Sequence, residues 1–272
     1  MEKIKLFKVL NKDMTTPFQK FQMEIDKEYH CDDFDDDIKK DCSTGYYATG
    51  IEGLIYFFNI SKRIFECEVW GKRAEINLFE RRYENIKLIR EIFRDEMKIL
   101  AEKEESRLGY KLSEALFPYN PLQHKGKVTE REIELLKKWA SFLIPIMDSN
   151  ECSVWYFIVN SIKHTINISV GNSVMASIRD FIMTSIMDSF SNSFSKSIRS
   201  FIGISLWAYL SSLFLNIKKW AYVEHIEGEN PYQPCIDLWK SNLIPSFDGK
   251  IWRLHTGPEA EIIYEMTFVN KY

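Results

Sequence analysis

The sequence contains little glycine, proline or cysteine and has no surplus of basic residues. With 11 Gly and 8 Pro among 272 residues, it is neither collagen-like nor of low complexity. Lys and Arg total 36 against 39 Asp and Glu, so the chain lacks the basic footprint of a dedicated nucleic-acid-binding protein, and no nucleic-acid partner is expected. The five cysteines are widely spaced, which is typical of a reducing compartment rather than a disulfide framework.

Motifs for common chemistries are also missing. The sequence has no phosphate-binding glycine loop, no HExxH metal motif and no GxSxG nucleophile motif. No cysteines are paired at zinc-ligand spacing, so neither a metal nor another cofactor is expected. The N-terminal residues lack the apolar stretch of a secretory signal, and the expected location is the cytoplasm. These absences favour a binding protein over an enzyme.

Changes in composition divide the chain into four segments, and together they predict an α+β fold. Residues 1–78 predict a small, strand-rich α+β domain. Residues 79–152 predict a helical connector with two amphipathic helices. Residues 153–216 form a tetrapeptide repeat, and residues 217–272 predict a C-terminal capping module built on a β-hairpin.

Local patterns place elements within the first two segments. Alternating apolar residues predict three strands, at residues 5–10, 20–25 and 63–70. Apolar residues at spacings of three and four predict one helix over residues 79–107, which Gly109 ends. Thr129 and Glu132 have the spacing of a capping box at the start of the second helix, and Pro145 marks its end.

The repeat consists of sixteen consecutive tetrads over residues 153–216. The second place of each tetrad is Val, Ile, Leu or Phe, and the first place is Ser in ten of them. Residues four apart on an α-helix drift by about 40° per step, so one straight helix cannot keep this row on one face over sixteen steps. A strand would place the polar fourth positions beside the apolar second positions. The period therefore favours a β-solenoid that turns a corner once per tetrad.

Two alternatives to the solenoid remain open. Several short packed helices would each tolerate the drift over about three turns. A membrane span is a weaker alternative, because residues 200–217 are uncharged and long enough to meet the lower limit for a spanning helix. The C-terminal segment predicts a β-hairpin. Asp248 and Gly249 predict a tight turn, with hairpin strands at residues 250–255 and 261–268.

Two stretches of the sequence resemble known phage proteins. The Ser-apolar tetrads, WAYLSSLF (207–214) and the tail YQPCIDLWKSNLIPSFDGKIWRLH (232–255) resemble uncharacterised proteins of bacteriophages and bacterial mobile elements. Their repeats often read DSVW, and their tails resemble DLW…PSFDG…WRLH; the similarity covers roughly residues 153–265. In the N-terminal segment, a lysine-flanked first strand is followed by the pattern FQ…EIxKxY, a cysteine and a GYYA turn. These residues are Phe21, Glu24, Ile25, Lys27, Tyr29, Cys42 and Gly45-Tyr46-Tyr47-Ala48. The pattern resembles a small phage-associated domain that usually has His where this chain has Tyr47. The resemblance implies a phage or mobile-element origin and an intracellular protein, and brings no activity.

The first functional hypothesis is a non-enzymatic interaction protein. In a phage context, the expected partner is a host bacterial defence or regulatory factor, which the protein would bind and inhibit. An acidic run could mimic phosphate charge in a basic groove of that partner. The candidate interaction residues are Asp32, Asp33, Asp35, Asp36 and Asp37. The predicted solenoid would have unpaired β-strand edges at its ends. Such edges can pair with another copy of the chain, so a homo-oligomer is expected.

Two further hypotheses involve small molecules. Aromatic residues beside glycine turns, among them Tyr46 and Tyr47, suggest a protein that sequesters a nucleotide-like ligand. Arg253 and His255 should share the outward face of a hairpin strand and could bind a phosphate or carboxylate, unless Arg253 pairs across the hairpin with Glu261 or Glu265. The third hypothesis is an enzyme. Its candidate residues are His225, Cys235 and His255, which could form a thiol–imidazole pair.

Overall fold

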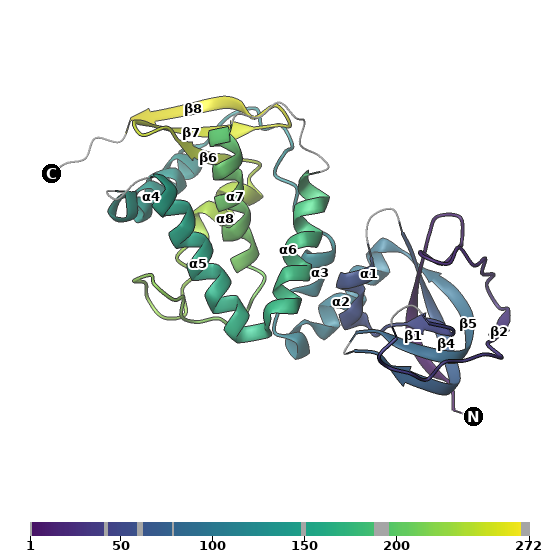
Figure 1. Cartoon of the computed structure of the whole chain (residues 1–272). Coiled ribbons are helices and arrows are strands. Elements are labelled where there is room, and N and C mark those ends of the chain that lie inside the picture. Colours follow the sequence, from purple (N-terminus) through teal and green to yellow (C-terminus); the bar gives the residue numbers. More distant parts are fainter. Residues whose placement is uncertain are drawn as a thin grey trace. The chain divides into compact units, whose positions relative to one another are not determined.

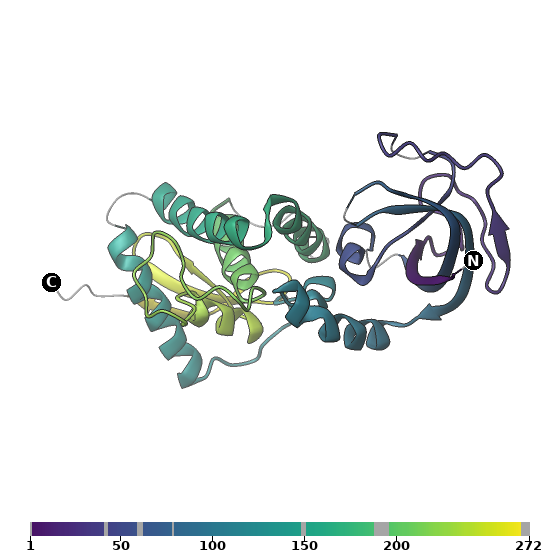
Figure 2. The ribbon, with the colours of Figure 1, turned by 90° about the horizontal axis from the view of Figure 1, so that it is seen from below.

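The protein contains two compact units, Met1–Phe117 (unit 1) and Pro118–Tyr272 (unit 2). The structure is a computed structural model that describes residues 2–40, 43–58, 62–77, 79–147, 151–187 and 196–267. Figure 1 labels the elements, and Figure 2 shows the same ribbon turned by 90°. Each unit combines one antiparallel sheet with helices, which confirms the α+β class. The predicted connector at residues 79–152 is divided between the two units.

Unit 1 is built on a five-stranded sheet. Its strands are β1 (Ile4–Leu10), β2 (Glu28–His30), β3 (Tyr46–Ala48), β4 (Arg63–Glu75) and β5 (Arg81–Ile92). The order is β1-β4-β5-β2, and β3 pairs with β5 beside β2. β1 and β4 confirm the strands predicted at residues 5–10 and 63–70.

The strand predicted at residues 20–25 was wrong. Among the described residues of this segment, Gln22 and Ile25 form only isolated bridges. The backbone takes positive φ angles of 56° at Lys20 and 65° at Asp26. These left-handed positions turn the chain at both ends of the segment, so too few extended residues remain to form a ladder.

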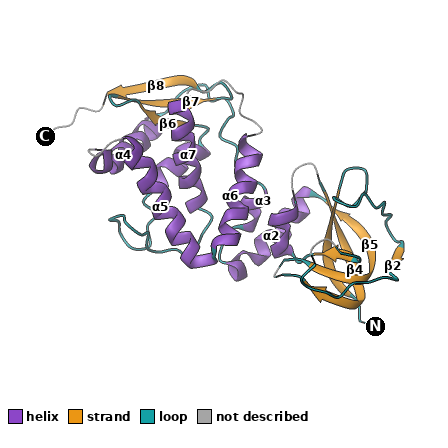
Figure 3. Cartoon of the chain, in the orientation of Figure 1, coloured by secondary structure: helices purple, strands orange, loops and turns teal. Residues whose placement is uncertain are grey.

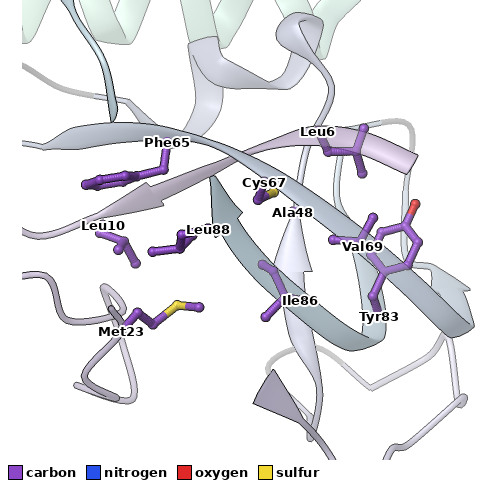
Figure 4. Packing of buried hydrophobic residues seen from close by; sticks show 10 residues of the cluster. All are labelled: Leu6, Leu10, Met23, Ala48, Phe65, Cys67, Val69, Tyr83, Ile86 and Leu88. Carbon is purple, nitrogen blue, oxygen red and sulfur yellow. The ribbon is translucent and has the colours of Figure 1, made fainter. Parts of the chain in front are cut away.

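The core of unit 1 lies on one face of this sheet. Figure 4 shows its side chains gathered between the strands. The cluster comprises Leu6, Leu10, Met23, Ala48, Phe65, Cys67, Val69, Tyr83, Ile86 and Leu88. Because side chains alternate along a strand, Leu6 and Leu10 place Lys8 on this same buried face. Lys8 lies opposite Phe65 in the β1–β4 register, and only 6% of it is exposed.

The helix predicted at residues 79–107 was wrong for its first half, which is strand β5. Register shifts interrupt the pairing of β4 with β5, one of them between Trp70 and Arg73. Gly71 lies within that irregularity at φ 88°, and a Cβ there would meet the side chain of Asn85 at 2.5 Å. Along β5 itself, Tyr83 and Ile86 both enter the core at a spacing of three, which resembles a helical pattern.

The second half of that prediction was confirmed by a helix. The helical elements of unit 1 are η1 (Ile51–Gly53), α1 (Leu54–Phe57), α2 (Arg94–Leu108) and α3 (Leu112–Leu116). Gly109 ends α2 in a left-handed conformation, φ 77°, and its N–H donates to the Glu105 carbonyl. Glycine suits this position because it has no Cβ to oppose a positive φ.

Unit 2 contains a three-stranded sheet. Figure 3 shows helices beside this sheet. The elements of unit 2 are α4 (Glu130–Met147), α5 (Glu151–Val170), α6 (Asn172–Met187), α7 (Lys196–Ser211), α8 (Gln233–Lys240), β6 (Ile244–Phe247), β7 (Ile251–Thr256) and β8 (Glu261–Thr267). The strand order of the sheet is β6-β7-β8. The capping box is confirmed: the Thr129 N–H donates to Glu132 Oε2 at 2.8 Å, and the Glu132 N–H returns to Thr129 Oγ1 at 3.4 Å. α4 continues two residues beyond Pro145, which does not end it as predicted.

The β-solenoid predicted for residues 153–216 was wrong, and the alternative of short helices describes the structure. α5, α6 and α7 cover the repeat, apart from residues 188–195, which lie outside the described part, and residues 212–216, which follow α7. Gly171, at φ 87°, separates α5 from α6. A drift of about 40° per tetrad excludes one long helix but not three short ones, since a row of three residues drifts by only about 80°.

Burial follows the apolar second place of the tetrads within each helix. Each buried row contains three residues four apart: Ile158, Ile162 and Ile166 in α5; Ile178, Ile182 and Ile186 in α6; and Ile202, Leu206 and Leu210 in α7. Small serines lie beside these rows. Ser161 is fully buried, and its Oγ accepts a hydrogen bond from Tyr232 Oη at 2.7 Å.

The C-terminal sheet confirms the predicted hairpin and adds a third strand. β7 and β8 match the predicted strands to within one residue, and β6 pairs with the other edge of β7. Asp248 closes the first turn, because its Oδ1 accepts the N–H groups of Lys250 at 3.0 Å and Ile251 at 2.8 Å. The span predicted as an alternative at residues 200–217 is not formed: no helix in the described part is long and apolar enough to cross a membrane.

Candidate ligand-binding site

Unit 1 contains a largely apolar cavity of about 360 Å³. Residues 7–9 of β1 form one wall, and residues 44–49, which include β3, form another. The loop of residues 16–21 supplies Pro17, Phe18 and Phe21. We call this space the β1–β3 cavity. Its volume lies within the range of about 300 to 1,000 Å³ that is usual for small-molecule sites.

The cavity forms where β1 and β3 separate. Phe7 and Thr49 form a single antiparallel bridge, with N–O distances of 2.8 and 2.9 Å. Continued pairing in this register would place Tyr47 opposite Val9. Instead, the Tyr47 carbonyl accepts a hydrogen bond from Lys8 Nζ at 2.6 Å. A lysine side chain thus replaces a strand-to-strand hydrogen bond, and the gap beyond the bridge remains open.

Lys8 is the only basic side chain among the described residues that line this cavity. Burial lowers the pKa of its ammonium from 10.5 to about 8. Within the described ranges no carboxylate forms an ion pair with it, although the charge of Glu80 acts on it and opposes part of this shift. A buried lysine without an ion-pair partner is uncommon, because removing an ammonium from water is costly.

Tyr47 connects the cavity to a second buried cation. Arg82 of β5 is fully buried, and its Nη1 donates to Tyr47 Oη at 2.9 Å. The same guanidinium also donates to the carbonyl of Asp37 at 2.9 Å and to that of Lys40 at 3.2 Å. Gly45 makes room for it, since a Cβ there would lie 2.6 Å from Arg82 Cγ. Arg82 therefore fixes both the Tyr47 ring and the loop before it.

Aromatic rings form the rim of the cavity. Of the lining residues, Phe21 and Tyr46 have ring centroids 6.1 Å apart, and outside the lining Phe21 meets Tyr29 edge to face at 5.4 Å. Tyr46 Oη donates to the His30 carbonyl at 3.2 Å. Phe18, which also lines the cavity, is 80% exposed. Tyr46 and Tyr47, two of the four predicted ligand-binding residues, therefore lie at one cavity.

The loop that carries Phe18 is closed by two hydrogen bonds. The Thr16 N–H donates to the Phe21 carbonyl at 2.8 Å, and the Phe21 N–H donates to Thr16 Oγ1 at 3.0 Å. Lys20 completes the turn at φ 56°. These two hydrogen bonds hold residues 16–21 as a compact loop that lines one side of the β1–β3 cavity.

The acidic run forms an internally bonded loop. Asp35 is its centre: it accepts hydrogen bonds from the Ser43 hydroxyl at 2.6 Å, the Asp37 N–H at 2.9 Å and Lys40 Nζ at 3.1 Å. These bonds, led by the one from Ser43, hold the pKa of the Asp35 carboxyl well below its usual range. Asp33 lines the cavity, where its Oδ1 accepts from the Cys31 thiol at 3.3 Å.

Other members of the acidic run are exposed on the surface, where a partner could contact them. The side chain of Asp32 is 97% exposed, and Asp36 and Asp37 are exposed residues. Burial, together with Asp33, raises the pKa of the Cys31 thiol to about 11, so this cysteine is a poor nucleophile near neutral pH. In the described part of the chain, no group of three or more His, Cys, Asp or Glu residues is placed to hold a metal ion.

The structure does not place Arg253 and His255 together on an outward face. Arg253 pairs with Asp248 at 2.5 Å and with Glu265 at 2.7 Å, the second being one of the cross-strand alternatives. His255 is instead 1% exposed, with both ring nitrogens within hydrogen-bond distance of Ser246 and the Ala260 carbonyl. The expectation of an outward Arg–His pair was therefore wrong.

His255 instead forms a buried pair with Ser246. Its Nε2 lies 2.6 Å from Ser246 Oγ, and its Nδ1 lies 2.9 Å from the Ala260 carbonyl. Because that carbonyl can only accept, Nδ1 carries the proton and Nε2 accepts from the serine hydroxyl. Although the pair has the connectivity of a nucleophile and a base, neither residue lines the β1–β3 cavity. Its geometry is that of a satisfied core histidine.

The remaining enzyme candidates have separate structural roles. His225 Nε2 accepts the Trp220 N–H at 2.8 Å, and its Nδ1 lies 2.8 Å from the Ile226 carbonyl. Cys235 is fully buried in α8, and burial raises the pKa of its thiol to about 12. Both nitrogens of His225 are therefore engaged, and Cys235 is a core residue.

Sequence reasoning missed Lys8, Phe21 and Arg82. A signal for Lys8 was present, since the two-residue period of Leu6 and Leu10 places it on the core face. Phe21 and Arg82 had no such signal, because each meets the site through contacts far apart in the sequence. Comparisons with models of protein families, with curated proteins and with solved structures give no match for this chain.

Proposed function

We propose that the protein binds a small molecule in the β1–β3 cavity. The observation that carries this proposal is a cavity of about 360 Å³, lined mostly by aromatic and aliphatic residues, with one buried amine at its wall. Apolar sites with a few fixed polar groups are typical of small-molecule binding. The ligand has an apolar or aromatic body and one oxygen-bearing group that accepts a hydrogen bond from Lys8.

The lining favours this ligand over a nucleotide. A nucleotide with several phosphates requires several cations or a row of backbone N–H donors. Among the described lining residues, Lys8 is the one cation, while Asp33 and Glu80 are acidic. A single carboxylate, sulfonate or carbonyl oxygen matches this balance of charge better than a polyphosphate chain does.

A buried ammonium supports the same proposal energetically. Among the described residues, Lys8 has one hydrogen-bond acceptor, the Tyr47 carbonyl, for its three donors. An oxygen of the ligand would accept from a second donor and compensate part of the desolvation of the charge.

Anilinonaphthalene sulfonate combines an aromatic body with one anionic group and therefore tests this site directly. The full chain should bind one equivalent with a saturable rise in fluorescence. Phe21→Ala should weaken binding about three- to tenfold, because it removes a rim aromatic. Phe93→Ala is the matched control: Phe93 is exposed and does not line the cavity. No saturable binding, or equal affinities for wild type and Phe21→Ala, would contradict the proposal.

Binding of a host bacterial factor is a second candidate function. It is favoured by the loop of residues 31–40, which exposes Asp32, Asp36 and Ile38 while Arg82 fixes its backbone. A preordered loop loses less entropy when it binds. Joint Asp32→Asn and Asp36→Asn substitution should abolish capture of a stoichiometric partner from bacterial lysate. Retained capture would exclude this loop. The homo-oligomer was predicted from the open ends of a β-solenoid, which the described part of residues 153–216 does not form, and light scattering on the same samples tests it independently of that argument.

A further inference from the structure

Lys8 combines the features that a reactive amine needs. It lines the β1–β3 cavity, it is 6% exposed, and its Nζ donates a 2.6 Å hydrogen bond to the Tyr47 carbonyl. A carbonyl oxygen can only accept, so the neutral amine would use an N–H for this bond and keep its lone pair free. No ion pair with a carboxylate holds the group charged within the described part of the chain.

We propose that Lys8 captures an aromatic or apolar aldehyde in this cavity as a Schiff base. This inference rests on the proposed small-molecule function and specifies its ligand chemistry. The Nζ lone pair attacks the aldehyde carbon, and the C=O bond opens to a carbinolamine. The carbinolamine hydroxyl then takes a proton and leaves as water, while a C=N bond forms. One aldehyde and one amine yield one imine and one water, with no oxidant or reductant.

The surroundings of Lys8 favour this reaction. Burial lowers the pKa of its ammonium to about 8, so about half of the chains carry the free amine at pH 8, whereas an ordinary lysine is almost fully protonated there. Apolar walls restrict water and so slow hydrolysis of the imine. Once formed, a protonated imine would still donate its N–H to the Tyr47 carbonyl, so the existing hydrogen bond need not be broken.

Reductive trapping tests the inference. The full chain is incubated with benzaldehyde and cyanoborohydride near pH 8, and intact mass spectrometry with peptide mapping measures benzylation at each lysine. We expect the rate of benzylation at Lys8 to be at least tenfold higher than the rate at any other lysine, with one benzyl group added there. Lys8→Met and Lys8→Arg should lose this fast phase. Lys5→Met should retain it, because Lys5 is an exposed neighbour on β1 that pairs with Glu66.

The controls separate this inference from the proposed function. Benzyl alcohol, which fits the same space but has no electrophilic carbon, should slow labelling of Lys8 by competition. If anilinonaphthalene sulfonate binds and Lys8 is labelled no faster than Lys5, covalent capture is wrong and binding stands. If neither probe detects the cavity, both proposals are wrong. Circular dichroism of the two Lys8 variants verifies that loss of labelling does not reflect loss of fold.

Discussion

Lys8 Nζ donates a 2.6 Å hydrogen bond to the backbone carbonyl of Tyr47, two residues beyond the point where β1 and β3 part. The hydroxyl of the same Tyr47 accepts from Arg82 at 2.9 Å. One residue of a three-residue strand thus contacts two buried cations, one through its backbone and one through its ring. Because burying charge is unfavourable, these contacts predict measurable effects on stability.

Lys8→Met should raise the free energy of unfolding at neutral pH. The folded pKa of Lys8, about 8, lies below the unfolded value of 10.5, so the unfolded chain binds the proton more tightly. The stability contributed by this group is present above pH 10.5 and is lost as the pH falls towards 8. A shift of this size corresponds to about 3 kcal/mol at pH 7, which the substitution should largely recover.

Urea unfolding followed by circular dichroism from pH 7 to pH 10.5 measures this effect. The wild type should gain stability relative to Lys8→Met across this range. Lys5→Met controls for the loss of a lysine on the same strand and should follow the wild type. If wild type and Lys8→Met ran parallel, Lys8 would not be buried as a charged group.

Arg82→Met should loosen the loop of residues 31–40. The substitution leaves the carbonyls of Asp37 and Lys40 without their donor and should cost about 2 kcal/mol. Hydrogen exchange should quicken at the Asp35 amide, which donates to the Thr44 carbonyl at 3.2 Å. Arg73→Met, at an exposed position on β4, is the control and should change stability by less than about 0.5 kcal/mol. Unchanged protection of Asp35 would show that Arg82 does not hold the loop.

His255 should make unit 2 sensitive to acid. Burial lowers the pKa of this imidazole below its ordinary 6.5, with Arg253 adding to the effect, although the bond to Ala260 opposes it. Stability from His255 is therefore present above pH 6.5 and lost as the pH falls below that value. His255→Gln should lower stability by about 1 to 3 kcal/mol at pH 8. Its melting temperature should nevertheless fall less steeply than that of the wild type below pH 6.5, and equal slopes would contradict the argument.

Local patterns predicted the elements whose signal is local. Two-residue alternation identified β1 and β4, and the Thr129–Glu132 spacing identified the start of α4. β5 was mistaken for a helix because Tyr83 and Ile86 both enter the core at helical spacing. Its strand conformation depends on pairing with β4, which no pattern within residues 79–92 reveals.

The candidate site was predictable only where its residues adjoin in the sequence. Tyr46 and Tyr47 were found because aromatic residues beside Gly45 suggest a binding turn. The cavity itself depends on where β1 stops pairing with residue 49, about forty residues along the chain. Phe21 reaches it from a third segment, so only the assembled sheet shows that these residues meet.

Two isoleucines of α5 test the helical repeat. Ile162 is fully buried and occupies a second place, whereas Ile168 occupies a fourth place and is 75% exposed. Ile162→Ala should cost about 2 to 5 kcal/mol, because it opens a cavity against the neighbouring helices. Ile168→Ala should be neutral or stabilising by up to about 0.5 kcal/mol, since Ala favours helix more than Ile does.

The sign of the Ile168→Ala effect separates the two architectures. In a β-solenoid the same change would replace a strong strand former with a weak one and lower stability. Tryptophan fluorescence during urea unfolding is a suitable measurement, because six of the seven tryptophans, all except Trp70, lie in unit 2. A loss of stability in Ile168→Ala comparable to that in Ile162→Ala would refute a helix in which one isoleucine faces the core and the other faces solvent.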